Sequence, residues 1–314
     1  LPLPMASSPH HPLRGLRIAG TSSVAFGFLP LFTLPLMAIG LRTPSILTYR
    51  FLFAALAMFP LLLYKKIDLR LTVREIGVLL SLGLVYIASA MGLQLGYHYM
   101  PSGVATVVHF TYPVYVILLM LLFYRQRPTR VMILAILLAF FGVLCLSGLG
   151  LEKVDRRFLI GMLIVAPTGL AYASYMVIVN KSVVRTMNNI KLSFYALLAC
   201  GSGFLVIALF WGGLQGIPSL EAWGLTIALA LIPTVVANIT LVEGVKLIGS
   251  TMSAILGALE PLTAVVIGFL VFDEVLTPLR IVGVLLIILS VLLIALSGRI
   301  AYFFKVSRLR KRHR

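Results

Sequence analysis

Charged side chains are scarce in this sequence. Only 11% of the 314 residues are Asp, Glu, Lys or Arg, while 61% are hydrophobic and the mean hydropathy is +1.08. A soluble domain carries roughly 25% charged residues, so there is too little polar surface here to cover a water-soluble fold. We therefore expect an all-α integral membrane protein for which the lipid bilayer is the solvent.

Several patterns of catalysis and cofactor binding are also missing. The two cysteines, Cys145 and Cys200, lie inside apolar runs and form neither a disulfide framework nor a metal site. The sequence has no Gly-Lys-Ser/Thr phosphate loop and no His-Glu-x-x-His zinc motif. The three aspartates, Asp68, Asp155 and Asp273, fall in predicted loops, so no aspartate pair for intramembrane proteolysis is expected. We expect neither enzyme activity nor a metal or other cofactor.

Basic residues, in contrast, are in excess, with 26 Lys and Arg against 9 Asp and Glu. They lie in short segments between apolar runs and form no basic domain, so we expect no nucleic-acid partner. Ten apolar runs reach the length of about 20 residues that a membrane-spanning helix needs. These predicted helices cover approximately residues 18–40, 45–64, 75–97, 102–124, 131–149, 158–180, 191–212, 221–243, 250–272 and 278–298.

The distribution of Lys and Arg predicts the orientation. With a cytoplasmic N-terminus, 20 of them lie on the cytoplasmic side and 5 outside. Cytoplasmic loops carry the excess of Lys and Arg, so both termini are expected in the cytoplasm of an inner (plasma) membrane protein. Residues 1–15 read as a disordered leader without a signal-peptide pattern. Residues 299–314 read as a basic tail held near anionic headgroups.

The sequence contains an internal repeat. Residues 96–150 align with 244–298 at a constant offset of 148, without gaps. The informative identities are Gly96 with Gly244, Ser102 with Ser250, Pro113 with Pro261 and Gly150 with Gly298. Each half, 16–150 and 151–298, then holds five helices, and an odd number inserts the second half upside down. Inverted repeats are typical of secondary transporters, whose substrate site lies between the halves at mid-membrane.

One stretch carries a family resemblance. The segment "LVEGVKLIGSTMSAILGALEPLTAVVIGFLVFDEVLTPLRIVGVLLIILSVLL" includes Leu259-Glu260-Pro261, Asp273 to Pro278, and Gly283. It resembles the second repeat of the EamA-type branch of the drug/metabolite transporter superfamily. The first half matches through Tyr49-Arg50-Phe51 and Tyr112-Pro113-Val114, and departs from the pattern at Gln126 and His109.

The resemblance implies ten helices in two inverted repeats, with a central cavity lined by helices 1, 3, 4, 6, 8 and 9. It also implies export or exchange of small metabolites such as amino acids. A lipid-linked sugar flippase of the same superfamily is the alternative, and a membrane-embedded enzyme a weaker one. The expected partners are the small-molecule substrate and membrane lipids. Proton coupling, and either a monomer or a homodimer, are carried forward as hypotheses.

Prolines and polar residues mark the predicted cavity. Prolines fall inside predicted helices 1, 4, 6, 8 and 9, and each frees a backbone carbonyl that lipid cannot satisfy. These helices should therefore face protein or water. On these helices and on helix 3, aromatic, amide and hydroxyl residues recur at helical spacing. The predicted substrate-binding residues are Tyr86, Gln94, His109, Tyr112, Tyr172, Tyr175, Thr234, Asn238 and Glu260.

Three titratable residues in the spans carry sharper hypotheses. Glu260 lies about 15 Å into the membrane, counted from Ser250 at 1.5 Å per residue. It is either a proton carrier or a contact for a cationic group, or else a neutral acid bonded to a neighbouring helix. His109 is either an anion or proton site, or a satisfied buried histidine. Arg50 could snorkel outward or pair with Glu260, and we interpret it as a structural anchor.

Overall fold

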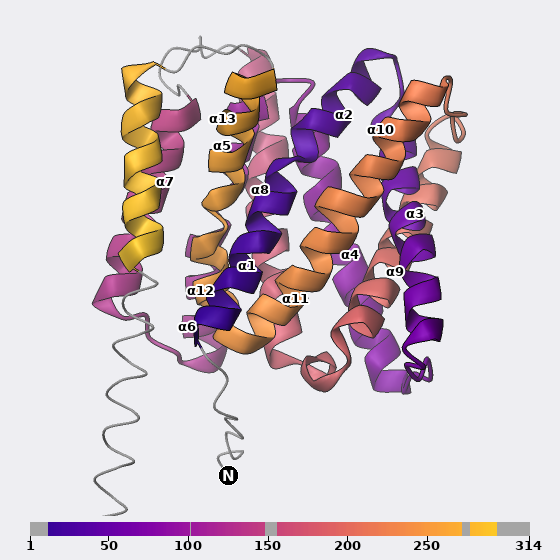
Figure 1. Cartoon of the computed structure of the whole chain (residues 1–314), viewed down its shortest axis with the longest axis horizontal. Coiled ribbons are helices and arrows are strands. Elements are labelled where there is room, and N and C mark those ends of the chain that lie inside the picture. The colour runs from indigo at the N-terminus through magenta and orange to yellow at the C-terminus, as the bar shows by residue number, and fades with distance from the viewer. Residues whose placement is uncertain (1–11, 101, 148–155, 272–276, 294–314) are drawn as a thin grey trace, which may run out of the picture.

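The computed structural model of the chain describes residues 12–100, 102–147, 156–271 and 277–293. These described residues form helices and connecting loops, with no strand among them (Figure 1). Seven helical segments, some of which join two consecutive helices, are long and apolar enough to cross a membrane. Three shorter apolar helices are also present. The all-helical prediction is therefore confirmed.

The helices of the first half run as follows. They are α1 (Pro12–Gly27), α2 (Leu29–Ala38), α3 (Thr43–Tyr64), α4 (Val73–Gly96), α5 (Ser102–His109), α6 (Tyr112–Tyr124) and α7 (Arg130–Ser147). The second half contains α8 (Arg156–Lys181), the short 3-10 turn η1 (Val183–Thr186), α9 (Asn189–Phe210), α10 (Leu220–Ala230), the π-helical segment η2 (Leu231–Val236), α11 (Ala237–Ile248), α12 (Ser250–Leu256) and α13 (Leu259–Val271). A last helix, which Figure 1 leaves unlabelled, covers Pro278–Leu293.

Four of the predicted helices are discontinuous, and each of the four is a helix in which the sequence places an interior proline. The first breaks between α1 and α2, the fourth between α5 and α6, and the ninth between α12 and α13; the eighth widens into η2. Pro30, Pro113, Pro233 and Pro261 stand at or just after these irregular turns. Each proline lacks the N–H that would continue the helical ladder. Pro167 is the exception, because α8 stays continuous there and Pro167 is exposed on its outer face.

Two of the four breaks, the one between α5 and α6 and the one between α12 and α13, fall at equivalent places in the two halves. The predicted offset of 148 relates Ser102 to Ser250, and these residues begin α5 and α12. It also relates Pro113 near the start of α6 to Pro261 near the start of α13. Helix contacts follow the same relation, because α1 packs on α11 as α4 packs on α8. The internal repeat thus extends from sequence to three-dimensional structure.

Polar contacts group the connecting loops at two ends of the bundle. At one end Arg14 pairs with Glu243 (3.0 Å between Nη2 and Oε1) and Lys246 donates to the carbonyl of Met187 (2.5 Å). At the other end the Arg42 side chain donates to the carbonyls of Trp211 and Gly212. In Figure 1, α1 begins and α6 stops at the end of the bundle that the Arg14–Glu243 pair marks. The helix α13 runs to the opposite end.

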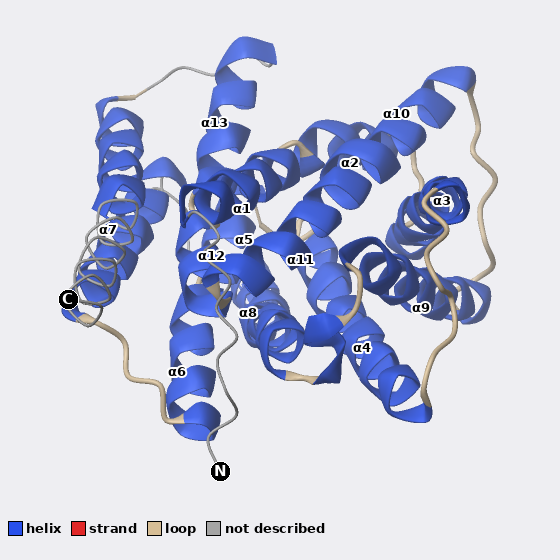
Figure 2. Ribbon diagram, turned by 60° about the horizontal axis from the view of Figure 1, so that its bottom comes forward, coloured by secondary structure: helices blue, strands red, loops and turns tan. Residues whose placement is uncertain are grey.

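The outer surface of the bundle is apolar, and the largely apolar interior also contains buried polar residues. Large apolar side chains face outward, among them Leu122 (71% exposed), Leu163 (76%) and Phe210 (90%). Figure 2 places α1, α5, α8, α11 and α12 in the middle of the bundle, with α3 and α9 on one side and α7 on the other. The interior holds polar residues such as Arg50 and Gln94. This distribution suits a protein whose solvent is lipid.

Candidate functional site

Five of the predicted site residues form one continuous set of rings. Tyr172 lies at its centre, with ring centroids 4.9 Å from Tyr112, 5.4 Å from His109 and 6.4 Å from Tyr175. Tyr86 joins through Tyr175, at 5.0 Å. We call these five residues, from α4, α5, α6 and α8, the aromatic cluster. The structure therefore brings together residues that are up to 89 positions apart in the sequence.

Close helix approaches position the cluster. Gly92 of α4 lies against α8 so tightly that an added Cβ would come within 2.5 Å of Thr168 Cγ2. Gly169 of α8 likewise lies against the carbonyl of His109 and the hydroxyl of Thr111. Small residues at such crossings let helix backbones approach closely in membranes. Tyr172 and Tyr175, one helical turn apart on α8, are thereby directed into the interior.

His109 has a defined hydrogen-bond partner. Its Nδ1 lies 2.9 Å from Thr168 Oγ1, and the Thr168 hydroxyl donates its own proton to the carbonyl of Val165 (2.5 Å). Thr168 Oγ1 therefore accepts from His109, which places the proton of a neutral imidazole on Nδ1. His109 Nε2 is then a hydrogen-bond acceptor. This geometry matches the predicted alternative of a buried histidine with a partner, and it leaves one nitrogen available for chemistry.

Four of the predicted residues have buried polar atoms without partners among the described residues. These atoms are Tyr86 Oη, Tyr175 Oη, both amide atoms of Gln94, and Asn238 Oδ1; of them, Tyr86 Oη lies close enough to the Asn238 side chain to interact with it, although no well-aligned hydrogen bond joins the two. Their residues are at most 4% exposed. More than nine in ten buried polar groups in folded proteins are hydrogen-bonded, and an unpaired one costs about 1–3 kcal/mol. A polar ligand or water would remove that cost here.

Glu260 lies in the first turn of α13, at the break after α12. Its amide donates to the carbonyl of Gly257 (2.9 Å), and its own carbonyl lies against Gly27 of α1. The carboxylate has no hydrogen-bond partner among the described residues, and the side chain keeps part of its surface accessible. It lies within electrostatic range of Arg50, Tyr112 and Tyr172.

Arg50 is the functional candidate that the sequence analysis left out of the site. It is only 3% exposed, so it does not snorkel outward. Its Nε donates to Thr234 Oγ1 (2.8 Å), its Nη2 donates to the carbonyl of Pro233 (3.3 Å), and its Cζ lies 4.9 Å from the ring centroid of Phe51. It forms no ion pair with Glu260. The available signal was its position, eight residues into a span that is otherwise uncharged.

Thr234 connects this arginine to the irregular turn in η2. Pro233 has no N–H, so the carbonyl of Leu229 loses its helical partner. The Thr234 hydroxyl replaces that partner, donating to the Leu229 carbonyl at 2.8 Å while it accepts from Arg50. One turn further on, Asn238 Nδ2 donates to the carbonyl of Thr234 (2.8 Å).

Two sides of the candidate site are therefore joined through α3. Phe51 contacts Tyr86 of the aromatic cluster (5.2 Å between centroids), and its neighbour Arg50 holds Thr234 of η2. Gln94 lies two turns beyond Tyr86 on α4. Among the described residues, no group of three or more His, Cys, Asp and Glu could hold a metal ion.

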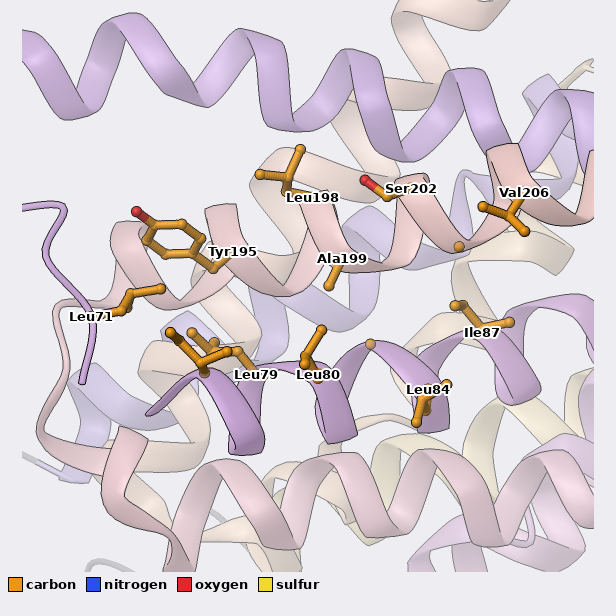
Figure 3. A pocket seen from close by; sticks show the side chains of 13 residues that line it. Leu71, Leu79, Leu80, Leu84, Ile87, Tyr195, Leu198, Ala199, Ser202 and Val206 are labelled. Carbon is orange, nitrogen blue, oxygen red and sulfur yellow. The ribbon is translucent and has the colours of Figure 1, made fainter. Parts of the chain in front are cut away.

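A separate apolar groove lies between α4 and α9 (Figure 3). It has a volume of about 590 Å³, and none of the predicted site residues lines it. Its lining includes Leu79, Leu80, Leu84 and Ile87 from α4, and Tyr195, Leu198 and Val206 from α9. Because Leu80 and Leu84 are more than half exposed on the outer surface, this groove belongs to the lipid-facing side.

Comparisons with known proteins agree with this architecture. Residues 13–148 and 159–296 each match the model of the EamA-like transporter family. A transporter of Synechocystis sp., named uncharacterized transporter sll1319, is 25% identical over 204 residues, which are 64% of this chain and 61% of that protein. Uncharacterized transporter YcbK of Bacillus subtilis is 23% identical over 199 residues, 60% of this chain and 62% of that protein.

The chain thus aligns with about three fifths of the length of each of these relatives. A solved crystal structure with 16% sequence identity superposes with a TM-score of 0.78, over 91% of this chain and 98% of the other. That likeness shows a shared fold. Because both halves match one family model, this chain is a multi-pass membrane protein that belongs to the EamA-like transporter family.

Proposed function

We propose that this protein is a secondary transporter that exports or exchanges a small metabolite, such as an amino acid, by alternating access. The observation that carries the proposal is the set of buried, unpartnered polar atoms on Tyr86, Gln94, Tyr175 and Asn238. Helices of both halves surround these atoms. A group of buried polar atoms inside an apolar bundle suits a binding site for a polar ligand, which the protein can release on either side of the membrane.

The proposed architecture is two inverted five-helix units, 16–150 and 151–298, with both termini in the cytoplasm. The equivalent breaks before α6 and α13 support it, because interrupted helices can bend where their ladder is already open. Rocking of one unit against the other would open the site to alternate faces of the membrane. A single transition can do so because the two units are similar in structure.

In this proposal the nine predicted residues contact the substrate or its immediate surroundings. The tyrosines and His109 supply flat apolar walls with polar edges. Gln94 and Asn238 supply amides that fix orientation, while Glu260 offers the carboxylate of the second half. Thr234 contributes indirectly, because its hydroxyl is already engaged by Arg50 and Leu229.

The experiment compares the metabolites that cells accumulate or release with and without the protein. The leading compounds are then tested for counterflow in proteoliposomes. Asn238→Trp should abolish counterflow, because Asn238 is fully buried in the proposed site. The matched control is Val236→Trp, two residues away and 43% exposed on the outer face. Full activity of Asn238→Trp, or equal loss in both variants, would contradict the placement of the site.

A further inference from the structure

One buried arginine has an unused hydrogen-bond donor beside the aromatic cluster. Two nitrogens of Arg50 have acceptors, Thr234 Oγ1 and the carbonyl of Pro233, but Nη1 has none among the described residues. A guanidinium group stays charged at physiological pH. Charged groups within membrane spans are rare and mark functional sites. The two bonds explain how Arg50 is held, and they leave one amino group of the fork free.

Glu260 is the oppositely charged counterpart. In the described spans, Arg50 and Glu260 are the only Lys, Arg, Asp or Glu that lie more than five residues from an end. Arg50 follows Thr43 by seven residues, or about 10 Å, and Glu260 follows Ser250 by ten, or about 15 Å from the opposite end. Since the hydrocarbon core is roughly 30 Å thick, the two charges lie at similar depths.

These two charges influence each other electrostatically but form no ion pair. Near Arg50, the side chains of Tyr86 and Asn238 lie close to each other without a well-aligned hydrogen bond, and both offer polar atoms to a ligand. Tyr86 is connected to Arg50 through Phe51, whose ring contacts both. The interior therefore presents one cation, one anion and neutral polar groups.

We propose that Arg50 binds an anionic group of the transported molecule and Glu260 a cationic group, so that the substrate is a zwitterion of the amino-acid type. This inference rests on the proposed transport function. A zwitterion satisfies both charges at once, whereas a simple anion leaves Glu260 unpaired and a simple cation leaves Arg50 unpaired. Removing one partner of a buried pair is strongly unfavourable, so both charged ends of the substrate contribute to recognition.

The test measures ligand-induced thermal stabilisation of the purified full chain in detergent. The twenty protein amino acids are screened first. The tightest binder is then compared with its carboxamide, which lacks the negative charge, and its N-acetyl derivative, which lacks the positive one. We expect both derivatives to bind at least about tenfold more weakly, as for lost charge-assisted hydrogen bonds.

Variants assign each charge to its residue. Arg50→Gln should bring the amino acid and its carboxamide to within about twofold, while discrimination against the N-acetyl form is retained. Glu260→Gln should show the reverse pattern. Arg50→Lys should keep part of the carboxylate preference, because it keeps the charge without the fork. Arg14→Gln, which removes an arginine at the end of the bundle, is the matched control and should change neither ratio.

Several results would overturn the inference. They are binding of none of the twenty amino acids, equal binding of a singly charged derivative, and an unchanged carboxylate preference in Arg50→Gln. Identical ratios in Arg50→Lys and Arg50→Gln would reduce Arg50 to a brace for η2. If Arg50→Gln does not fold, a carboxylate preference in Arg50→Lys equal to that of the wild type overturns the inference, and a weakened one supports it.

The proposed function is tested separately by counterflow. Charge discrimination without counterflow of any amino acid would contradict transport and leave the binding inference standing. Counterflow of a singly charged metabolite, with no discrimination between the amino acid and its two derivatives, would support transport and contradict the binding inference.

Discussion

Glu260 shows how one residue can combine structural and functional demands. It occupies the first turn of α13, where Pro261 follows and the helix restarts. Its carboxylate has no hydrogen-bond partner among the described residues and is not fully enclosed. An unpaired carboxylate in a membrane span costs several kcal/mol when charged. Such a position favours a group that binds and releases a proton or a cationic ligand.

We expect Glu260→Gln to abolish or uncouple transport while leaving the protein folded. Gln keeps the size and hydrogen-bonding edge of the side chain but cannot carry a charge. The measurement is counterflow and gradient-driven uptake in proteoliposomes across a range of pH. Glu243→Gln is the control, since Glu243 pairs with Arg14 at the end of the bundle, and an exposed pair contributes only about 0–1 kcal/mol. Unchanged, pH-dependent transport in Glu260→Gln would remove this residue from the mechanism.

At the scale of elements, discontinuous helices meet where the halves touch. The Tyr112 hydroxyl at the start of α6 fills the space that a side chain on Gly257 would need at the end of α12. The offset of 148 makes Tyr112 the equivalent of Glu260 and His109 the equivalent of Gly257. The two breaks are thus related in sequence and in contact in the fold, with different chemistry on each side.

Gly257→Ala should therefore destabilise the protein. The backbone of Gly257 is ordinary for a helix (φ −55°), so only the new methyl group matters. Overpacking of a tight core site costs typically about 1–3 kcal/mol. We expect a lower midpoint of thermal unfolding in detergent and restoration of part of that loss in Gly257→Ala combined with Tyr112→Phe, because the hydroxyl is removed but Cζ of the ring would still lie 2.8 Å from the new methyl carbon. Wild-type stability of Gly257→Ala alone would show that the two helices are not packed as described.

At the scale of the whole molecule, hydropathy and periodicity predicted the all-helical membrane fold, and the constant offset predicted equivalent helices. The interior prolines were predicted to free backbone carbonyls, but the sequence does not say which of them interrupts its helix. A proline can bend a helix, interrupt it or, as at Pro167, leave it continuous, and the packing of neighbouring helices decides which occurs.

The candidate site, too, was predicted only in part. Helical spacing identified the tyrosines that the fold brings into one aromatic cluster. Arg50 was interpreted as a structural anchor on the strength of the family resemblance, and its partners, Thr234 and the carbonyl of Pro233, could not be predicted because they are more than 180 residues away in the sequence. Only tertiary packing shows that Arg50 lies inside, with a donor left over.

The central claim is that two similar halves cross the membrane in opposite directions around this interior site. The most direct measurement replaces Gln126, after α6, and Thr277, before the last helix, by cysteine in a background without Cys145 and Cys200. Both positions are exposed. With a membrane-impermeant thiol reagent on intact cells and on inverted vesicles, we predict labelling of Gln126→Cys only from the cytoplasmic side and of Thr277→Cys only from outside. Labelling of both from the same side would contradict the account.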